Sequence, residues 1–343
     1  MAKKFLLLLA AVAIVSLRLP SVALGAAPVY EGKTMRIIVG YSAGGGYDAY
    51  ARVLSRHMGR HLPGHPAIIV ENMAGAGSLL SANHVYRIAK PDGLTIGHFN
   101  GGLFFNQVMG QPGVEFDARK FEYIGATVKE EVAFAFSKKS GITSMEQWIS
   151  SGTPVKMGGV APGAFAPDNV IRVVKAALGV PTQLVTGYKG TADIRLAVES
   201  GELAGSAWGW ASMKSTWRKS LDSGEAVVVL QGVPKAFPDL PKVPLAIQFA
   251  KTAEAQQLIE VGIHSPSIFA RPFVLPPGTP REHVELLEKA LAETLKDKEF
   301  LAEAEKSKMD IEPVTSRELK QAVEGIFKLD SKTVAKLNDI LFK

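Results

Sequence analysis

The sequence predicts an α/β fold in which two doubly wound lobes flank a cleft. Short β-branched runs alternate with helical patterns, and glycine-rich turns join the runs to the helices. This arrangement occurs twice in succession near the N-terminus and begins again at residue 155, which is typical of two parallel sheets. Ligands of such sheets bind outside the carboxyl ends of the strands, where the glycine turns lie.

The first of these turns carries the strongest functional signal. Arg36–Val39 reads as a buried strand, three glycines follow at positions 44–46, and apolar residues recur at helical spacing from Tyr50. The first amides of a helix have no partner within it, and the helix dipole adds partial positive charge there. Glycine also allows a ligand to approach the main chain closely. The turn therefore predicts a site for a carboxylate or phosphate.

The same patterns assign the remaining elements in order. The first lobe continues with strands at 67–70 and 94–97 and a helix around 80–88, whereas residues 101–121 read as irregular. A strand is predicted at 132–137, and the second lobe is predicted to contain strands at 155–160, 183–185, 206–210 and 226–230 and helices at 143–150, after Pro167 and before Gly201. A strand at 267–274 and a helix with Thr279 as N-cap and Pro280 at its first position lead into a helical C-terminal region. We expect residues 26–134 and 264–343 to form lobe 1 and residues 135–263 to form lobe 2.

The N-terminus predicts export. Lys3 and Lys4 precede an apolar run from Phe5 to Val15, and small residues at 23–25 offer a cleavage site, so residues 1–25 read as a signal peptide. About 318 residues then remain, enough for two lobes with substantial cores. Loss of Lys3, Lys4 and Arg18 lowers the net charge from +6 to +3, and no cationic run remains, which argues against nucleic-acid binding. The chain has no cysteine, which excludes disulfides and thiolate metal sites.

Two enzyme classes are alternatives for the first turn. Residues 40–44 match the G-x-S-x-G nucleophile elbow of a serine hydrolase with Ser42 as nucleophile, but Gly45 and Gly46 extend the turn and no Asp–His pair is recognisable downstream. Residues 44–49, with Glu71 at the end of the next strand, satisfy a relaxed dinucleotide-binding pattern. That pattern is a lone glycine motif, and export makes a nicotinamide enzyme less favoured.

A histidine series suggests a metal site only weakly. His57, His61 and His65 recur every fourth residue, but a glycine at 59 and a Pro-Gly pair at 63–64 break the helix that would align them. A solvated helix end is the favoured interpretation, and no metal or cofactor is predicted. Trp208 and Trp210 fit a core position better than a ligand cage.

Four segments, taken in order, resemble the periplasmic solute-binding proteins of tripartite tricarboxylate transporters, the Bug family. The segments are MRIIVGYSAGGGYDAYARVL, AIIVENMAGAGSLLSANHVYRIAKPDGLTIG, GYKGTADIRLAVESGEL and VLPPGTPREHVELLEKAL. The resemblance implies a type II periplasmic-binding-protein fold, with hinge strands between two lobes and an organic anion held in the cleft. It also implies a permease of two integral membrane subunits as partner, and neither a reaction nor a cofactor. We expect a monomeric periplasmic protein.

Carried over by position, the resemblance places the ligand in loops of both lobes. In relatives these loops hold carboxylates through main-chain amides, hydroxyls and ordered waters. The candidate ligand-binding residues are Tyr41, Ser42, Ala43, Gly44, Gly45, Asp48, Gly75, Ala76, Gly77 and Ser78 in lobe 1, and Gly163, Ala164, Phe165, Tyr188, Lys189, Gly190, Thr191, Ala192 and Trp208 in lobe 2. Asp48 could instead stabilise the helix dipole, and Lys189 could be a solvated surface lysine.

The chain departs from the family pattern at several of these positions. Ala43 and Asp193 stand where relatives usually have proline, and Ala197 stands where they tend to have an acid. Ala164–Phe165 replaces a stretch that carries hydroxyls. Fewer hydroxyls argue against a tricarboxylate, whereas the nearby tyrosines and tryptophans suit an apolar body. We therefore hypothesise a mono- or dicarboxylate ligand with an apolar or aromatic portion.

Overall fold

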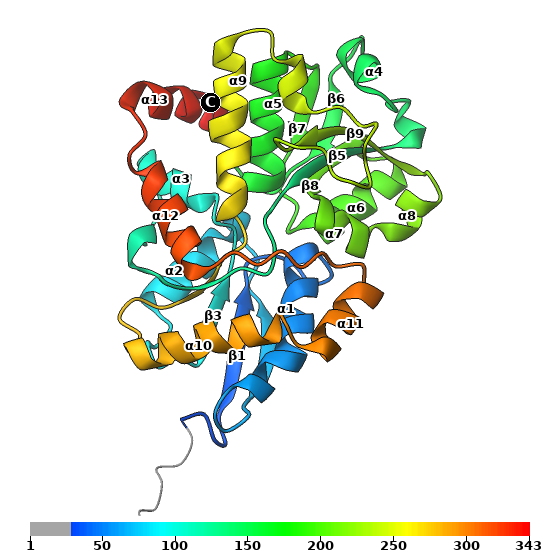
Figure 1. The fold of residues 1–343 in the computed structure, drawn as a ribbon. Coiled ribbons are helices and arrows are strands. Elements are labelled where there is room, and N and C mark those ends of the chain that lie inside the picture. The colour runs from blue at the N-terminus through cyan, green and yellow to red at the C-terminus, as the bar shows by residue number, and fades with distance from the viewer. Residues whose placement is uncertain (1–28) are drawn as a thin grey trace, which may run out of the picture.

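The computed structural model describes residues 29–343, which form two α/β lobes, each built around one five-stranded mixed sheet (Figure 1). The predicted signal peptide lies outside the described residues. In the described part of the chain, every helix is too short or too polar to cross a membrane. The predicted α/β class with two doubly wound lobes is confirmed.

The first sheet has the strand order β2-β1-β3-β10-β4. Its strands are β1 (Thr34–Val39), β2 (Ala67–Asn72), β3 (Thr95–His98), β4 (Glu122–Gly125) and β10 (Phe273–Leu275). β1 pairs in parallel with β2 and β3, whereas β10 is antiparallel to both of its neighbours. The carboxyl ends of the three parallel strands therefore share one edge, from which the glycine turns emerge.

Helices cover both faces of this sheet and bury its β-branched side chains. They are α1 (Gly46–Met58), α2 (Leu79–Arg87), α3 (Leu103–Val108), α10 (Arg281–Thr294), α11 (Lys298–Lys306) and α12 (Ser316–Ile326). β3 is buried along its whole length, as expected for a central strand covered on both faces. In Figure 1 these helices make up most of the lower lobe.

The second sheet repeats the arrangement with the order β7-β6-β8-β5-β9. Its strands are β5 (Val132–Ser137), β6 (Val155–Gly158), β7 (Thr182–Val185), β8 (Gly205–Gly209) and β9 (Ala226–Gly232). β6 is parallel to β7 and β8, and β5 is antiparallel to β8 and β9. The helices of this lobe are α4 (Met145–Ile149), α5 (Val170–Leu178), α6 (Thr191–Ser200), α7 (Trp210–Thr216), α8 (Arg218–Asp222), α9 (Ala253–Ile259) and α13 (Ser331–Phe342).

Two segments, 126–131 and 265–272, connect the two sheets and run beside each other, and residues 327–330 lead from α12 in the first lobe to α13 beside α5. The amide of Glu130 in the first segment donates to the carbonyl of Ser267 in the second, at 2.9 Å. β5, the first strand of the second sheet, begins at Val132, and the C-terminal helix α13 contacts α5. The division of the chain at 134/135 and 263/264 stays a prediction.

Three predicted local features differ from the structure. Residues 267–274 do not form one strand, because Ser265–Ile268 is a 3-10 turn and β10 has three residues. Helix α10 begins at Arg281 with Pro280 as its N-cap, while the Thr279 hydroxyl donates to the carbonyl of Pro276 at 2.8 Å. The region predicted to be irregular contains α3, whose apolar side chains pack into the core instead of following an amphipathic pattern.

Candidate functional site

The loops at the carboxyl ends of the two sheets face each other and are in contact. The amide of Ser42 donates to the carbonyl of Lys189 at 3.1 Å, and the Ser42 hydroxyl donates to the carboxylate of Asp193 at 2.7 Å. Deeper in the interface, the amide of Phe165 donates to the side-chain oxygen of Asn100 at 3.2 Å. The first and last of the predicted loops thus lie at the interlobe surface.

Glycines allow this contact to be close. A Cβ atom on Gly45 would lie 2.9 Å from the Thr191 hydroxyl oxygen, and one on Gly77 would lie 3.1 Å from the Cβ of Ala164. A Cβ on Gly190 would lie 2.7 Å from the Ser42 hydroxyl oxygen. Real Cβ atoms essentially never approach other heavy atoms to less than 3.0 Å, so a side chain at Gly45 or Gly190 would force the Thr191 or Ser42 hydroxyl to move.

A small cavity of about 10 Å³ lies between the lobes. It is lined by residues of both lobes and of one connecting segment: Tyr41, Gly45, Gly46, Tyr47, Glu130, Val160, Ala166, Thr191, Trp208 and Ser212. This volume is about the minimum that one water molecule needs. A carboxylate can therefore enter only when the loops of the two lobes move apart.

Aromatic rings form much of the cavity wall. The rings of Tyr41 and Tyr47 meet edge to face, with their centroids 4.9 Å apart. Trp208 stacks on Trp217 with a centroid distance of 5.2 Å, and its indole N–H is buried without a hydrogen-bond partner. Trp210 does not line this cavity, and its indole N–H donates to Asp239 at 3.0 Å. The two tryptophans, which the sequence pattern could not separate, thus have different surroundings.

The predicted lobe 1 residues divide between the cavity and local structure. Tyr41 and Gly45 line the cavity, whereas Ala43, Gly44 and Ala76 are exposed and Gly75 is partly buried. The buried Ser78 hydroxyl donates to the carbonyl of Gly40 at 3.1 Å, so it stabilises the turn.

Asp48 has local partners that account for its burial. Its carboxylate accepts hydrogen bonds from the main-chain amide of Gly44 at 2.8 Å, from Nε of Arg52 at 2.9 Å and from the side-chain Nδ2 of Asn72 at 2.9 Å. Burial raises the pKa of Asp48, but these three donors outweigh it, and the pKa lies below its usual value. The interpretation of Asp48 as an acid that stabilises the start of α1 fits these contacts better than ligand contact.

The predicted lobe 2 residues are also only partly brought together. Thr191 and Trp208 line the cavity, and Ala192 and Gly190 lie against the first loop of lobe 1. The third predicted loop, Gly163, Ala164 and Phe165, is buried against lobe 1. A Cβ on Gly163 would meet the side chain of Asn106 at 2.3 Å, and Phe165 lies next to Gly102. Tyr188 points elsewhere, since its hydroxyl donates to Glu202 at 2.5 Å, and the Lys189 side chain is exposed.

The sequence analysis missed a buried ion pair beside the cavity. Nε of Arg271 lies 2.9 Å from Oε2 of Glu130, and the two side chains are 1% and 3% exposed. Burial lowers the pKa of Arg271, but the Glu130 carboxylate raises it, and the net shift is upward, so the guanidinium is charged. The guanidinium carbon also lies 4.5 Å from the ring centre of Tyr47 and 4.9 Å from that of Tyr50.

A signal for this pair does exist in the sequence. Arg271 is a lone charge in the otherwise apolar stretch Ile268–Val274. Glu130 is followed by Glu131 and then by β5, whose six residues are all buried. A charged residue amid buried apolar neighbours is rarely left unpaired. The sequence pattern does not show that the partner of Arg271 is Glu130, which lies 141 positions away in the chain.

Two titratable groups are buried close to the interlobe surface. Burial raises the pKa of Asp168 to about 7, partly opposed by the hydrogen bond that its carboxylate accepts from the amide of Val160 at 2.6 Å. Burial and the nearby Arg271 lower the pKa of His98 to about 3, so its ring is neutral and donates through Nδ1 to the carbonyl of Pro272. Both groups are therefore uncharged over part of the acidic pH range.

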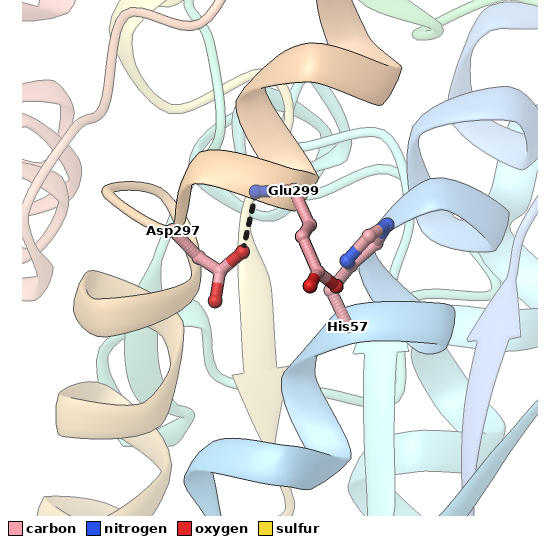
Figure 2. A group of neighbouring side chains, drawn as sticks. All are labelled: His57, Asp297 and Glu299. Atoms are coloured by element: carbon pink, nitrogen blue, oxygen red, sulfur yellow. Dashed lines mark hydrogen bonds between the residues drawn. The ribbon is translucent and has the colours of Figure 1, made fainter.

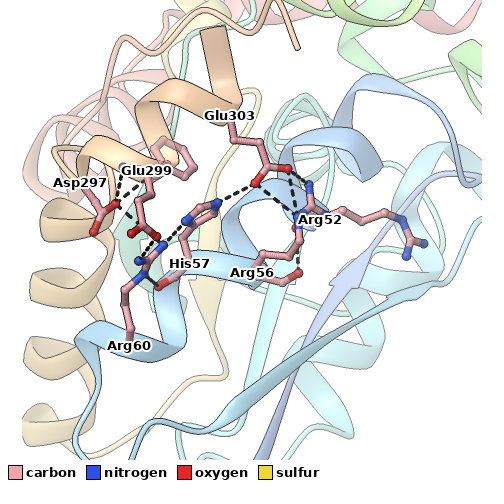
Figure 3. Close-up of polar contacts among 9 residues, drawn as sticks. Arg52, Arg56, His57, Arg60, Asp297, Glu299 and Glu303 are labelled. Atoms are coloured by element: carbon pink, nitrogen blue, oxygen red, sulfur yellow. Dashed lines mark hydrogen bonds and ion pairs between the residues drawn. The ribbon is translucent and has the colours of Figure 1, made fainter. Parts of the chain in front are cut away.

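The histidine series leads to an ion-pair cluster between α1 and α11. His57, Asp297 and Glu299 offer three atoms within 4.8 Å of one another, as a metal site would (Figure 2). Figure 3 shows that Arg60 reaches into this group, where it contacts Glu299 and His57, while Nε2 of His57 lies 2.6 Å from Glu303. A guanidinium already occupies the position of a cation, so these residues join the helices electrostatically. His57 is 7% exposed, so the prediction of a solvated helix end was wrong for this residue.

The nucleophile elbow is not supported by its surroundings. In the described part of the chain, the Ser42 hydroxyl donates to Asp193, an acceptor that lacks the imidazole expected of a hydrolase base. Glu71, the acid of the dinucleotide-binding alternative, lies 3.9 Å from Arg36 on the partly exposed side of β2. The first turn therefore lacks the contacts that either enzyme class requires.

Comparison with known proteins identifies the family. The model of the tripartite tricarboxylate transporter family receptor matches residues 50–338. The chain belongs to this family. Its members are solute-binding proteins of the periplasm rather than enzymes, which confirms the family resemblance and the prediction that the protein is not an enzyme.

Individual relatives are distant in sequence, and the solved ones share the fold. A UPF0065 protein of Bordetella bronchiseptica is 24% identical over 287 residues, which cover 81% of this chain and 77% of that protein. The periplasmic binding protein BugD is 22% identical and superposes with a TM-score of 0.74 over 90% of this chain and 98% of its own. An R. palustris protein solved with adipate is 19% identical, with a TM-score of 0.72 over 90% and 97% of the two chains.

Proposed function

We propose that the protein captures a small organic carboxylate between its lobes and delivers it to a membrane permease of two integral subunits. The observation that carries the proposal is the convergence of loops from both sheets, together with the N-terminus of α1, on one cavity between the lobes. Amides at a helix N-terminus favour an anion, and adipate, found with a protein of the same fold, is a carboxylate. The permease is proposed from the family alone.

The aromatic lining supports a ligand with an apolar or aromatic portion. Tyr41, Tyr47 and Trp208 present ring surface to the cavity. Apart from the tyrosines, the lining side chains that carry a hydroxyl are those of Thr191 and Ser212. Such a wall favours an acid whose body is apolar over one that is polar throughout. We propose a mono- or dicarboxylate of this kind and export to the periplasm by the predicted signal peptide.

Lobe closure is the proposed mechanism. A carboxylate binds first to the loops of one lobe, the loops of the other lobe complete the cage, and the permease recognises the closed form. The hydrogen bonds between Ser42 and lobe 2 show which groups can join the loops when they meet. Closure excludes water, which strengthens each polar contact to the carboxylate.

A thermal-shift screen tests the proposal. The purified mature protein is heated with benzoate, phenylacetate, adipate, malate or citrate, and with glucose and lysine as controls. A ligand present at one hundred times its Kd stabilises the native protein by about 2.7 kcal/mol. We expect stabilisation by carboxylates with an apolar portion and no hydrolysis of p-nitrophenyl acetate. Stabilisation by none of the acids, or turnover of the ester, would contradict the proposal.

A further inference from the structure

Arg271 has more hydrogen-bonding capacity than its partner uses. Its side chain is 1% exposed, and its Nε forms an ion pair at 2.9 Å with Oε2 of Glu130, an oxygen that accepts no hydrogen bond. Nη1 and Nη2 are both buried without a hydrogen-bond partner. Arginine carries four N–H groups on these two atoms, and a buried donor without an acceptor is costly.

The neighbouring rings do not satisfy these donors. Tyr47 and Tyr50 lie 4.5 and 4.9 Å from the guanidinium carbon, where their ring faces stabilise the positive charge. The hydroxyl of Tyr47 donates to the carbonyl of Ala270 at 2.7 Å, and neither Nη1 nor Nη2 of Arg271 makes a hydrogen bond to it. The guanidinium is thus held in place and kept charged while its outer N–H groups stay unpaired.

The unpaired groups lie beside the cavity, at the first residue of α1. A Cβ on Gly46 would be 2.9 Å from Nη2 of Arg271 and 2.1 Å from the hydroxyl oxygen of Ser212. Ser212 is 2% exposed, and its hydroxyl has no hydrogen-bond partner either. Gly46 and Ser212 both line the cavity. Three kinds of donor therefore meet here: a guanidinium, a hydroxyl and the free amides of a 13-residue helix.

We propose that this point is the seat of the ligand's carboxylate, which accepts hydrogen bonds from Arg271 and Ser212 next to the N-terminus of α1. The inference rests on the proposed function and adds to it a cationic side chain that touches the ligand. A carboxylate matches the paired N–H groups of a guanidinium edge in geometry as well as in charge.

The charge balance limits the ligand to one carboxylate. Among the described residues that line the cavity, Glu130 is the one charged side chain, and Arg271 behind Gly46 compensates it. The partial positive charge of α1, about half an elementary charge, offsets part of one additional anion. A second buried carboxylate would face Glu130 without a cation of its own, which is strongly unfavourable. The preferred ligand is therefore a monocarboxylate whose apolar body contacts Tyr41, Tyr47 and Trp208.

Calorimetric titrations with benzoate and with its neutral isostere benzamide test the seat. The main variant is Glu130→Gln/Arg271→Gln, because removing the two charges together leaves no unpaired buried charge. We expect the Kd for benzoate to rise about tenfold to a hundredfold and the Kd for benzamide to change little. Ser212→Ala removes one hydroxyl and should weaken benzoate binding by about threefold to tenfold. Arg281→Gln, on the exposed side of α10, is the matched control and should leave both affinities unchanged.

Each alternative result is decisive. An unchanged Kd for benzoate in both test variants, or an equal loss for benzoate and benzamide, would show that the pair is structural and overturn the seat. Binding restricted to adipate, malate and citrate would overturn the limit to one carboxylate while leaving the proposed function intact. If the double variant does not fold, Ser212→Ala carries the comparison by itself. Failure of the wild-type protein to bind any of these acids would instead refute the proposed function.

Discussion

Gly46→Ala should act as a wedge between the lobes. The new Cβ would lie 2.1 Å from the hydroxyl oxygen and 2.5 Å from the Cβ of Ser212, which belongs to α7 of the other lobe. The residue is the first of α1 and is not among the residues with positive φ, so alanine suits its backbone and the cost arises from the contact alone. Overpacking of this kind costs about 1–3 kcal/mol. The ratio of closed to open molecules should therefore fall by about 5- to 150-fold.

Distances between spin labels at Leu80→Cys and Leu196→Cys measure this shift. Both leucines are exposed, on α2 and α6, whose N-termini lie at the interlobe loops, and the absence of natural cysteines makes the labelling specific. We expect Gly46→Ala to broaden the distribution toward longer distances. Gly46→Ala/Ser212→Gly should restore it, because the remaining neighbour is the flexible end of Arg271. Gly325→Ala, a helical glycine with nothing within 4 Å, is the control. Equal distributions for wild type and Gly46→Ala would refute the reasoning.

Three further predictions concern titratable groups. Because the pKa of Asp168 is raised to about 7 from 3.8, its contribution to stability falls as pH rises from about 4 to 7. In urea titrations, the free energy of unfolding of wild type should therefore fall between pH 4 and 8 relative to that of Asp168→Asn, by about 4 kcal/mol. Parallel pH profiles for the two proteins would contradict this. The pKa of His98 is lowered to about 3, so its contribution to stability is lost as pH falls from 6.5 toward 3, and nitrogen NMR should show a neutral ring at pH 5 rather than a titration near 6.5. Zinc should not raise the melting temperature, since Arg60 contacts Glu299 and His57 in the cluster of Figure 3, and a saturable rise would show a metal site there.

Local patterns in the sequence were sufficient for most elements of the fold. Strands such as β3 and β5 consist of contiguous buried residues, and Gly179 and Gly201 end their helices in the left-handed conformation that glycine favours. β4 was missed, because four residues without a flanking turn signal give too little pattern. The predicted strand at 267–274 was wrong because its apolar residues are buried in a turn of the connecting segment as well as in β10.

The site was less accessible to sequence reasoning because its contacts are long-range. Tyr41, Gly45 and Thr191 were predicted from the family resemblance, whose loops coincide with glycine turns that are local features of the sequence. Arg271 and Ser212 were not predicted. The lone charge of Arg271 in an apolar stretch indicates a buried partner but not which one, Ser212 belongs to no motif, and only the fold brings both to Gly46. The same limit explains Asp48: its position at a helix start was evident from the sequence, but its three donors were not.

Retention of small molecules from a defined mixture tests the central claim most directly. The mature protein is incubated with equimolar benzoate, phenylacetate, citrate, glucose and lysine, freed of unbound material, and denatured, and the released molecules are quantified by mass spectrometry. The structure leads us to expect close to one singly charged carboxylate per chain and little of the other compounds. Release of glucose or lysine in place of an acid would contradict the account, as would a protein that retains none of the five.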